Sequence, residues 1–518
     1  MCSTKLKLTL GLAAAVATNV LAQPSTPAPA VPPAPTNAPA APATATNAAP
    51  APADQGRSGG NGFLKAYDNW NREVKNPVSW FSWGADFRFR NEYFNNAITL
   101  NEDGIRHEQD YFRFRERIWA TVLPVTNVSL NARFSGEQRE WMKPSYASQF
   151  DFGEGLEWRY GILDNAYAKW SNIGNVPLTI SAGRQDVQFG EPLNWWLVGD
   201  GTPDDGSWTF FLDSIRANYD IKDLKTKVDV VYIYQQARPD ATIPTVGESS
   251  DNKPTPYMLT EQNEQGVIFY LSNKSINNMQ LDGYFIYKRD DKELAYGDNA
   301  NIYTIGSKVS GTPTTNWAYS VEGAYQFGDK QDATVLPAYT TSPTAWRNID
   351  AYGANARLTY LCRDKLNNQF SFAVECLSGD NPNTKGTDEM FDVLWGRWPR
   401  WSELYIYSYI NETSRKIAQM NNIIRFGPTW VCTPIKNTTF SATYNPMFAI
   451  ENTPTRAANP TLFSDDGTFR GHYLQTVLKH KFNEHLSGHL WAEFVWMGDY
   501  YTHNNCMTFL RGELLYTF

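Results

Sequence analysis

The sequence predicts an all-β fold: a transmembrane, antiparallel, up-and-down β-barrel of about 18 strands with long extracellular loops. Three observations favour this fold. Apolar and polar residues alternate in one segment after another, long and short connections alternate between those segments, and the chain ends in phenylalanine on such a segment. A period of two places successive side chains on opposite faces of a strand. In a membrane barrel, one face meets lipid and the other lines a wet lumen.

The start of the chain has the pattern of a secretory signal peptide. Lys5 and Lys7 precede an apolar run that small residues end, and the run is too short to span a bilayer comfortably. The stretch that follows is rich in Pro, Ala and Thr and cannot bury enough apolar surface to fold. The predicted organisation is a signal peptide (1–22), a disordered Pro/Ala-rich tether (23–60), a periplasmic lead-in (61–79) and the barrel (80–518).

The composition fits a barrel and excludes some partners. Aromatic residues make up 14% of the chain, with 18 Trp and 28 Tyr, which suits aromatic girdles at two membrane interfaces. The net charge of -8 gives no case for nucleic acid as a partner. No metal or organic cofactor is implied, because the cysteines after the signal peptide lack close metal-ligand spacing; they are Cys362, Cys376, Cys432 and Cys506.

Alternating segments recur along the whole body. Long connections include 142–160 and 450–466, and short ones include 124–126 and 483–484. Long loops on one side and short turns on the other are typical of outer-membrane barrels. The predicted strands are 82–96, 109–122, 127–141, 161–171, 176–188, 208–220, 225–237, 264–273, 279–290, 300–309, 315–328, 348–361, 368–378, 420–432, 438–449, 467–482, 485–497 and 506–518.

One strand-like segment is left out of this set. Residues 404–409 have the composition of a strand, but counting them would put the long connection 450–466 on the short-turn side. Omitting them keeps the alternation and an even strand number, and makes 379–419 the longest outer loop. The loop is expected either to fold inward or cap the mouth and narrow the pore, or to pack on neighbouring loops. Its constriction candidates are Arg397, Trp398, Arg400 and Trp401.

Charged residues occupy the strand face opposite the apolar set. Arg113, Arg115 and Arg117 stand at every second position of one strand, and arginine is concentrated on the first three strands. Fixed charge sets the sign of the ion that a pore admits, and arginine binds carboxylate in a bidentate way. The predicted lumen-facing residues are Arg88, Arg90, Arg113, Arg115, Arg117, Arg133, Arg139, Arg216, Arg357, Arg425, Glu137, Glu375 and Glu493, together with Asp86, Glu92, Glu322, Arg511 and Glu513.

This face has a functional and a structural interpretation. It forms either a path for anionic, carboxylate-bearing solutes or a set of Arg–Glu pairs that brace a wet wall. Glu116 departs from the pattern because it falls among the lipid-facing positions, where a bulge or an interface position would accommodate it. The last strand ends at Phe518, which resembles the assembly signal of bacterial outer-membrane proteins and makes the assembly machinery an expected partner.

Several stretches resemble the alginate export family of bacterial outer-membrane barrels. They are the Arg-alternating 111–119, Gly-Arg-Gln-Asp-Val-Gln-Phe-Gly at 183–190, Leu-Asp-Ser-Ile-Arg at 212–216, and Ser-Gly-Asp at 378–380 before Phe-Asp at 391–392. The resemblance covers about 80–518. It implies an eighteen-stranded barrel with a positively charged lumen that passes an acidic polysaccharide, and it places Arg113, Arg115, Arg117 and Arg133 on the basic wall.

The leading hypothesis is a channel in the bacterial outer membrane for anionic carbohydrates, whether oligo- or polysaccharide, or for organic acids, with membrane lipid around it. A general diffusion porin without a dedicated substrate and an envelope-anchoring barrel that acts through the tether are the alternatives. An enzyme is not expected: His472 and Ser441 lie on strands, but no spacing links them to an acid.

Overall fold

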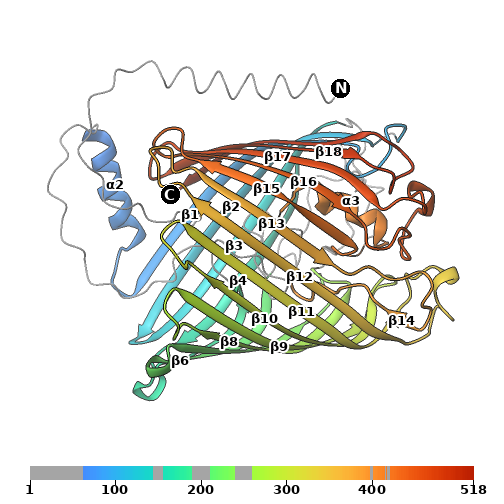
Figure 1. Cartoon of the computed structure of the whole chain (residues 1–518). Helices are drawn as coiled ribbons and strands as arrows, with labels where there is room; N and C mark the ends of the chain where they lie inside the picture. The colour runs from blue at the N-terminus through green and yellow to red at the C-terminus, as the bar shows by residue number, and fades with distance from the viewer. Residues whose placement is uncertain are drawn as a thin grey trace.

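The computed structural model describes residues 62–104, 106–143, 156–189, 211–239, 259–396, 401–414, 416 and 420–518. Within these residues, eighteen antiparallel strands form one closed barrel (Figure 1). Each strand pairs with the next along the chain, and pairing of the first strand with the last closes the ring. The predicted fold class is confirmed. The predicted signal peptide and tether lie outside the described residues.

Every predicted strand range overlaps a strand of the barrel. A further two-residue strand, β14 (Thr387–Asp388), pairs in parallel with β12. The barrel strands are β1 (Phe81–Asn95), β2 (Glu108–Val125), β3 (Val128–Lys143), β4 (Leu156–Trp170), β5 (Leu178–Gln185), β6 (Leu212–Ile221), β7 (Thr226–Gln235), β8 (Gln262–Asn273), β9 (Met279–Lys292), β10 (Asp298–Gly311), β11 (Trp317–Asp332), β12 (Arg347–Leu361), β13 (Gln369–Leu377), β15 (Ile423–Cys432), β16 (Thr438–Phe448), β17 (Phe469–Lys481), β18 (Leu486–Met497) and β19 (Cys506–Thr517).

The turns at one end of the barrel are short because asparagine reverses the chain there. Asn127, Asn278 and Asn437 adopt φ values of 66°, 59° and 63°. Asparagine tolerates this left-handed conformation better than other residues with a side chain. Short 3₁₀ helices lie in some connections: η1 (Ile173–Asn175), η2 (Lys222–Leu224), η3 (Pro337–Tyr339) and η4 (Pro460–Leu462).

Helix α2 (Gly62–Lys75) and the C-terminus lie at the short-turn end (Figure 1). The rings of Trp70 and Trp83 lie 5.8 and 5.2 Å from the ring of Phe518. The backbone amide of Phe518 also donates to the carbonyl of Ala85 on β1, at 2.9 Å. The last residue is therefore held between the helix and the seam where β1 meets β19.

The outer face of the barrel is apolar. Phe87, Ile118, Phe372 and Leu514 are among the large hydrophobic side chains that this face exposes. Such a surface is what a lipid bilayer covers. Across the described ranges, no helix has the length and apolar character needed to cross a membrane.

Glu116 lies on this outer face, among the residues that alternate with the arginines of β2. Its carboxylate accepts a hydrogen bond from Gln138 Nε2 on β3, at 3.0 Å. Gly136 gives it room, because a Cβ there would stand 3.2 Å from Glu116 Oε2. A partner on the neighbouring strand therefore holds the acid. The β2–β3 register is regular at Glu116, whereas the β3–β4 register shifts between Glu137 and Gln138.

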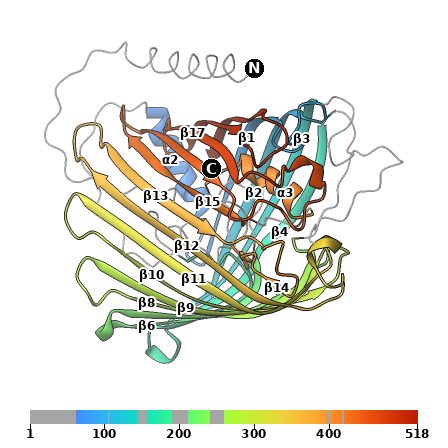
Figure 2. The same cartoon turned by 45° about the vertical axis from the view of Figure 1, so that its right-hand side comes forward.

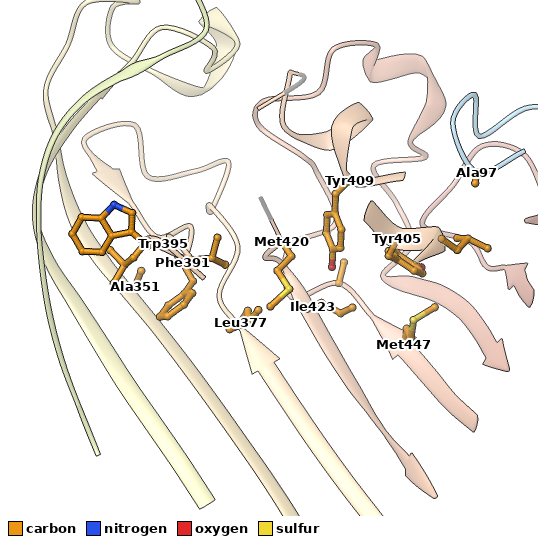
Figure 3. Packing of buried hydrophobic residues seen from close by; sticks show 14 of the residues in the cluster. Ala97, Ala351, Leu377, Phe391, Trp395, Tyr405, Tyr409, Met420, Ile423 and Met447 are labelled. Carbon is orange, nitrogen blue, oxygen red and sulfur yellow. The ribbon is translucent and has the colours of Figure 1, made fainter. Parts of the chain in front are cut away.

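The inside of the barrel contains a hydrophobic core, which an ordinary aqueous pore does not have. It forms where the described residues of 378–422, here called the inserted segment, pack against the inner wall (Figure 2). Phe391 and Trp395 of this segment are fully buried and lie beside Ala351 of β12 (Figure 3). Residues 404–409 are not a barrel strand but part of helix α3 (Leu404–Glu412), which the parity argument did not foresee.

Candidate functional site

Arginines face arginines across the first three strands. The register places Arg90 of β1 opposite Arg113 of β2, and Arg113 opposite Arg139 of β3. One pair further along, Arg88 stands opposite Arg115. Like charges directly opposite each other destabilise a sheet. We call the inward faces of β1, β2, β3 and β19 the basic wall.

Carboxylates on the same strands sit between these arginines. Glu92 Oε2 lies 3.3 Å from Arg113 Nη1, and Glu137 Oε2 lies 3.0 Å from Arg113 Nε. Glu137 also binds Arg139, at 2.5 Å. Glu513 of β19 binds Arg90. The side chains are almost fully buried, so they form a connected network rather than a row of separate solvated charges.

The network continues toward the seam and toward β4. Arg511 of β19 binds Glu92, with Nη2 2.8 Å from Oε1. Asp86 binds Arg115 at 3.1 Å and also binds Arg117. Arg133 reaches two further carboxylates, those of Asp164 at 2.9 Å and Asp186 at 3.0 Å.

The remaining predicted lumen residues also face inward, but on other strands. Arg216 pairs with Asp229 at 2.7 Å, and Arg425 pairs with Glu375 at 2.5 Å. Arg357 lies on the inward face of β12. These residues are distributed around the ring and do not join the basic wall.

Glu493 anchors the inserted segment to β18. Its carboxylate accepts hydrogen bonds from the backbone amides of Glu403 and Leu404, both at 3.0 Å, and from the Ser402 hydroxyl at 2.5 Å. These amides begin helix α3, where the helix dipole favours negative charge. The sequence predicted Glu493 as an acid of the lumen wall; its geometry makes it the cap of an internal helix.

Trp401 is held on the same side of the barrel. Its carbonyl accepts from Tyr473 Oη at 2.9 Å and from Gln475 Nε2 at 2.8 Å. The guanidinium of Arg425 lies 4.4 Å from the centre of the indole ring. Of the constriction candidates, Arg397, Trp398 and Arg400 lie outside the described residues.

The opposite side of the barrel holds the inserted segment by ion pairs. We call the inward faces of β9, β10 and β11, halfway round the ring from β1, the anchor wall. Lys416 Nζ lies 2.5 Å from Asp298 and 2.8 Å from Asp332. Arg456, from the loop before β17, also binds Asp332. Sequence reasoning missed these loop cations, because their partners lie far away along the chain.

Asp392 of the inserted segment faces the anchor wall too. Its carboxylate lies 3.6 Å from Lys330 Nζ and 4.0 Å from Lys288 Nζ. Burial acts to raise the pKa of Asp392, but these two ammonium groups hold it below its ordinary value. The acid therefore stays ionised and paired. In the described part of the chain, no three His, Cys, Asp or Glu side chains gather in a way that could hold a metal ion.

The alginate export family model matches residues 79–508. The chain belongs to the alginate export family. Together with the closed barrel and its apolar outer face, membership places this chain in the bacterial outer membrane, in contact with lipid, as a channel for solutes.

Solved structures similar to this member of the family include OccAB2 of Acinetobacter baumannii, with 12% identity, a TM-score of 0.49, and coverage of 84% of this chain and 98% of that one. They also include OccK8 (OprE) of Pseudomonas aeruginosa, with 11% identity, a TM-score of 0.48 and coverage of 84% and 98%. No curated protein matches the sequence.

Proposed function

We propose that the channel passes carboxylate-bearing solutes, either anionic carbohydrates or organic acids, along the basic wall. The observation that carries this proposal is the row Arg90, Arg113 and Arg139, in which three arginines are direct neighbours across three strands. A wall that needed only bracing would place arginine opposite glutamate. A row of like charges is stabilised by any anion that enters it.

The positive charge of this row is partly neutralised, which suits a site that must bind a solute and then release it. A site in a channel must bind a solute well enough to admit it and weakly enough to release it. Glu92 and Glu137 already neutralise part of the positive charge. A passing carboxylate therefore competes with the acids of the wall for the arginines, so it is not bound too tightly to be released.

Planar-bilayer recordings of the purified full chain test this proposal. In Arg113→Gln/Arg115→Gln, each wall acid keeps an arginine partner, since Arg139, Arg511 and Arg117 remain. We expect the reversal potential in a salt gradient to shift toward cation preference. Preference for cations in the unaltered protein would overturn the proposal.

A matched control removes two arginines from outside the barrel interior. Arg289 has a side chain that is 53% exposed and pairs with Asp291, and Arg363 is exposed in a short turn. Arg289→Gln/Arg363→Gln changes the net charge by the same amount. We expect its reversal potential to stay that of the unaltered protein, because exposed charges are screened by salt.

The pairing of the network arginines favours a second candidate, a general diffusion porin whose walls set only size and weak ion preference. Block of the current separates the two. Oligogalacturonate, a chain of uronic acids, should block a carboxylate channel at concentrations at which neutral maltotriose does not. Equal block by both sugars would favour the general porin.

We also propose that Phe518 is read by the assembly machinery of the outer membrane. Support comes from its position at the seam, where its amide binds β1 and its ring meets Trp83. Phe518→Ala should lower the fraction of protein that reaches the membrane folded, while the same variant refolded in detergent should form a barrel. Equal folded yield in cells would contradict this role.

A further inference from the structure

The network of the basic wall ends on a residue that does not belong to the wall. Arg511 Nη2 lies 2.5 Å from Glu403 Oε2, and Glu403 is part of the inserted segment. The same nitrogen lies 2.8 Å from Glu92 Oε1. The Arg511 and Glu92 side chains are 1% exposed, and that of Glu403 is 16% exposed. Of these two carboxylates on Arg511, the inserted segment thus supplies the more accessible one.

The backbone of Glu403 is fixed independently of its carboxylate. Its amide donates to Glu493, as does the next amide along the chain, and Ser402 binds the same acid. On the other side of α3, Arg470 binds Glu412 at 2.6 Å. The Glu403 carboxylate can therefore leave Arg511 by a rotation of its side chain, while α3 stays in place.

Aromatic rings line the surroundings of this ion pair. The guanidinium of Arg511 lies 5.6 Å from the centre of the Trp491 ring and 4.9 Å from that of Phe509. Trp401 lies two residues before Glu403 in the sequence. A flat apolar ring beside a guanidinium suits a ligand that carries a carboxylate on a sugar ring, because the C–H face of the sugar can cover the aromatic face.

We infer that the position of the Glu403 carboxylate on Arg511 is a binding site for the carboxylate of a uronic acid, and that Glu403 is the internal competitor of that solute. This inference rests on the proposed function. Exchange of one carboxylate for another keeps the charge of the network unchanged. The site therefore releases its solute by the return of Glu403, which keeps binding weak enough for passage.

The test measures the oligogalacturonate concentration that blocks half of the current. Glu403→Gln removes the competing charge and keeps the size of the side chain. The concentration for half-block, meaning block of half of the current, should therefore be about tenfold lower than in the unaltered protein. In Arg511→Gln the concentration for half-block should be about tenfold higher, because the solute loses the arginine that binds it. In the double variant, half-block should match that of Arg511→Gln alone, because the competitor has nothing left to occupy.

Glu102→Gln is the matched control, since Glu102 is an exposed carboxylate in the long loop between β1 and β2. It removes the same charge and should leave half-block unchanged. Heat-dependent electrophoretic mobility confirms that each variant is a folded barrel. If Arg511→Gln does not fold, Arg511→Lys keeps the charge but loses the two-pronged contact, and should still weaken block.

Two outcomes would overturn the inference. In the first, Glu403→Gln needs the same or a higher oligogalacturonate concentration for half-block than the unaltered protein. In the second, Glu403→Gln lowers that concentration by the same factor when Arg511 is also replaced. These results are distinct from failure of the proposed function. If oligogalacturonate blocks the unaltered protein but neither variant alters half-block, the function stands and this site fails. If the unaltered protein prefers cations, the proposed function fails, and this inference fails with it.

Discussion

The basic wall and the anchor wall face each other across the barrel, and both are densely charged. On the basic wall, acids pair with arginines of neighbouring strands, as Glu92 of β1 does with Arg113 of β2. On the anchor wall, Asp298 and Asp332 take Lys416 from the inserted segment, and Lys330 reaches back to Asp392. The first wall is balanced almost wholly by its own strands. The second has pairs of its own as well, such as Lys330 with Asp298 at 2.9 Å, but it also makes several pairs with the segment that it holds.

This difference separates two uses of buried charge. A wall that pairs with a loop fixes that loop, because separating the two leaves buried charges with fewer partners. A wall that pairs within itself stays intact when the loop moves and remains available to a solute. The Arg511–Glu403 contact is where the two arrangements meet.

The largest expected effect comes from Lys416→Met on the anchor wall. It removes two charged contacts, to Asp298 at 2.5 Å and to Asp332 at 2.8 Å. Asp298 keeps Lys330 and Asp332 keeps Arg456, so the cost is that of two hydrogen bonds between charged groups, about 1.5–3 kcal/mol each. We expect a lower midpoint of chemical unfolding and a noisier open-channel current. Lys143→Met, at a pair whose ammonium side chain is 55% exposed, should cost only about 0–1 kcal/mol. Equal losses in both variants would remove the distinction between the walls.

A smaller effect is expected at the cap of α3. Glu493→Gln keeps the shape of the side chain but removes the charge that accepts two backbone amides. Hydrogen bonds to charged groups contribute about 1.5–3 kcal/mol. Limited proteolysis should cut the inserted segment faster, while the barrel strands stay protected. Unchanged cleavage would show that the anchor wall alone holds the segment.

Glu137→Gln tests whether the basic wall acts on ions. Its carboxylate lies between Arg113 and Arg139, so its removal makes the wall more positive. We expect the permeability ratio of anion to cation to rise by roughly twofold, since a ring of fixed charge sets selectivity. A fall in this ratio would contradict the role proposed for the wall.

The smallest expected effect is a pH dependence from Glu389 in the inserted segment. Burial, with a contribution from Asp380, raises the pKa of Glu389 to about 7. Because the unfolded chain loses this proton at about pH 4.3, the unfolded state binds fewer protons between the two values. The free energy of unfolding should therefore fall as the pH rises toward 7 and stay level above it. Glu389→Gln should remove this slope, and an unchanged slope would assign it to another group.

The strands were predictable because their signal is local. Alternation at Arg113, Arg115 and Arg117 sets the face, and asparagine at positions such as Asn127 sets the turn. Helix α3 was not predictable in this way, because the composition of 404–409 suits a strand as well. Its state depends on Glu493, which lies far along the chain and caps it.

The site was predictable only in part, for the same reason. Sequence alternation assigned the wall arginines to the inward face, and the structure places them there. It could not give their register, and the register is what sets Arg90 beside Arg113. Nor could it identify Glu403 or Lys416, because a loop sequence has no regular alternation from which the contacts of its side chains can be predicted. Loop 379–419 was expected either to fold inward or cap the mouth, or to pack on neighbouring loops, and the structure places its described residues inside the barrel.

The basic wall straddles the seam of the barrel. Arg90 on the first strand binds Glu513 on the last, and Glu92 binds Arg511 across the same junction. Contacts between the two ends of a chain form late, after the entropy of closing the whole loop has been overcome. An unfinished barrel thus has a split arginine network, and each open edge carries both an arginine and a glutamate that match the opposite charge on the other edge. Closure of the barrel joins these charges. The residues that are proposed to select a solute thus also attract the first and last strands to each other and favour their pairing.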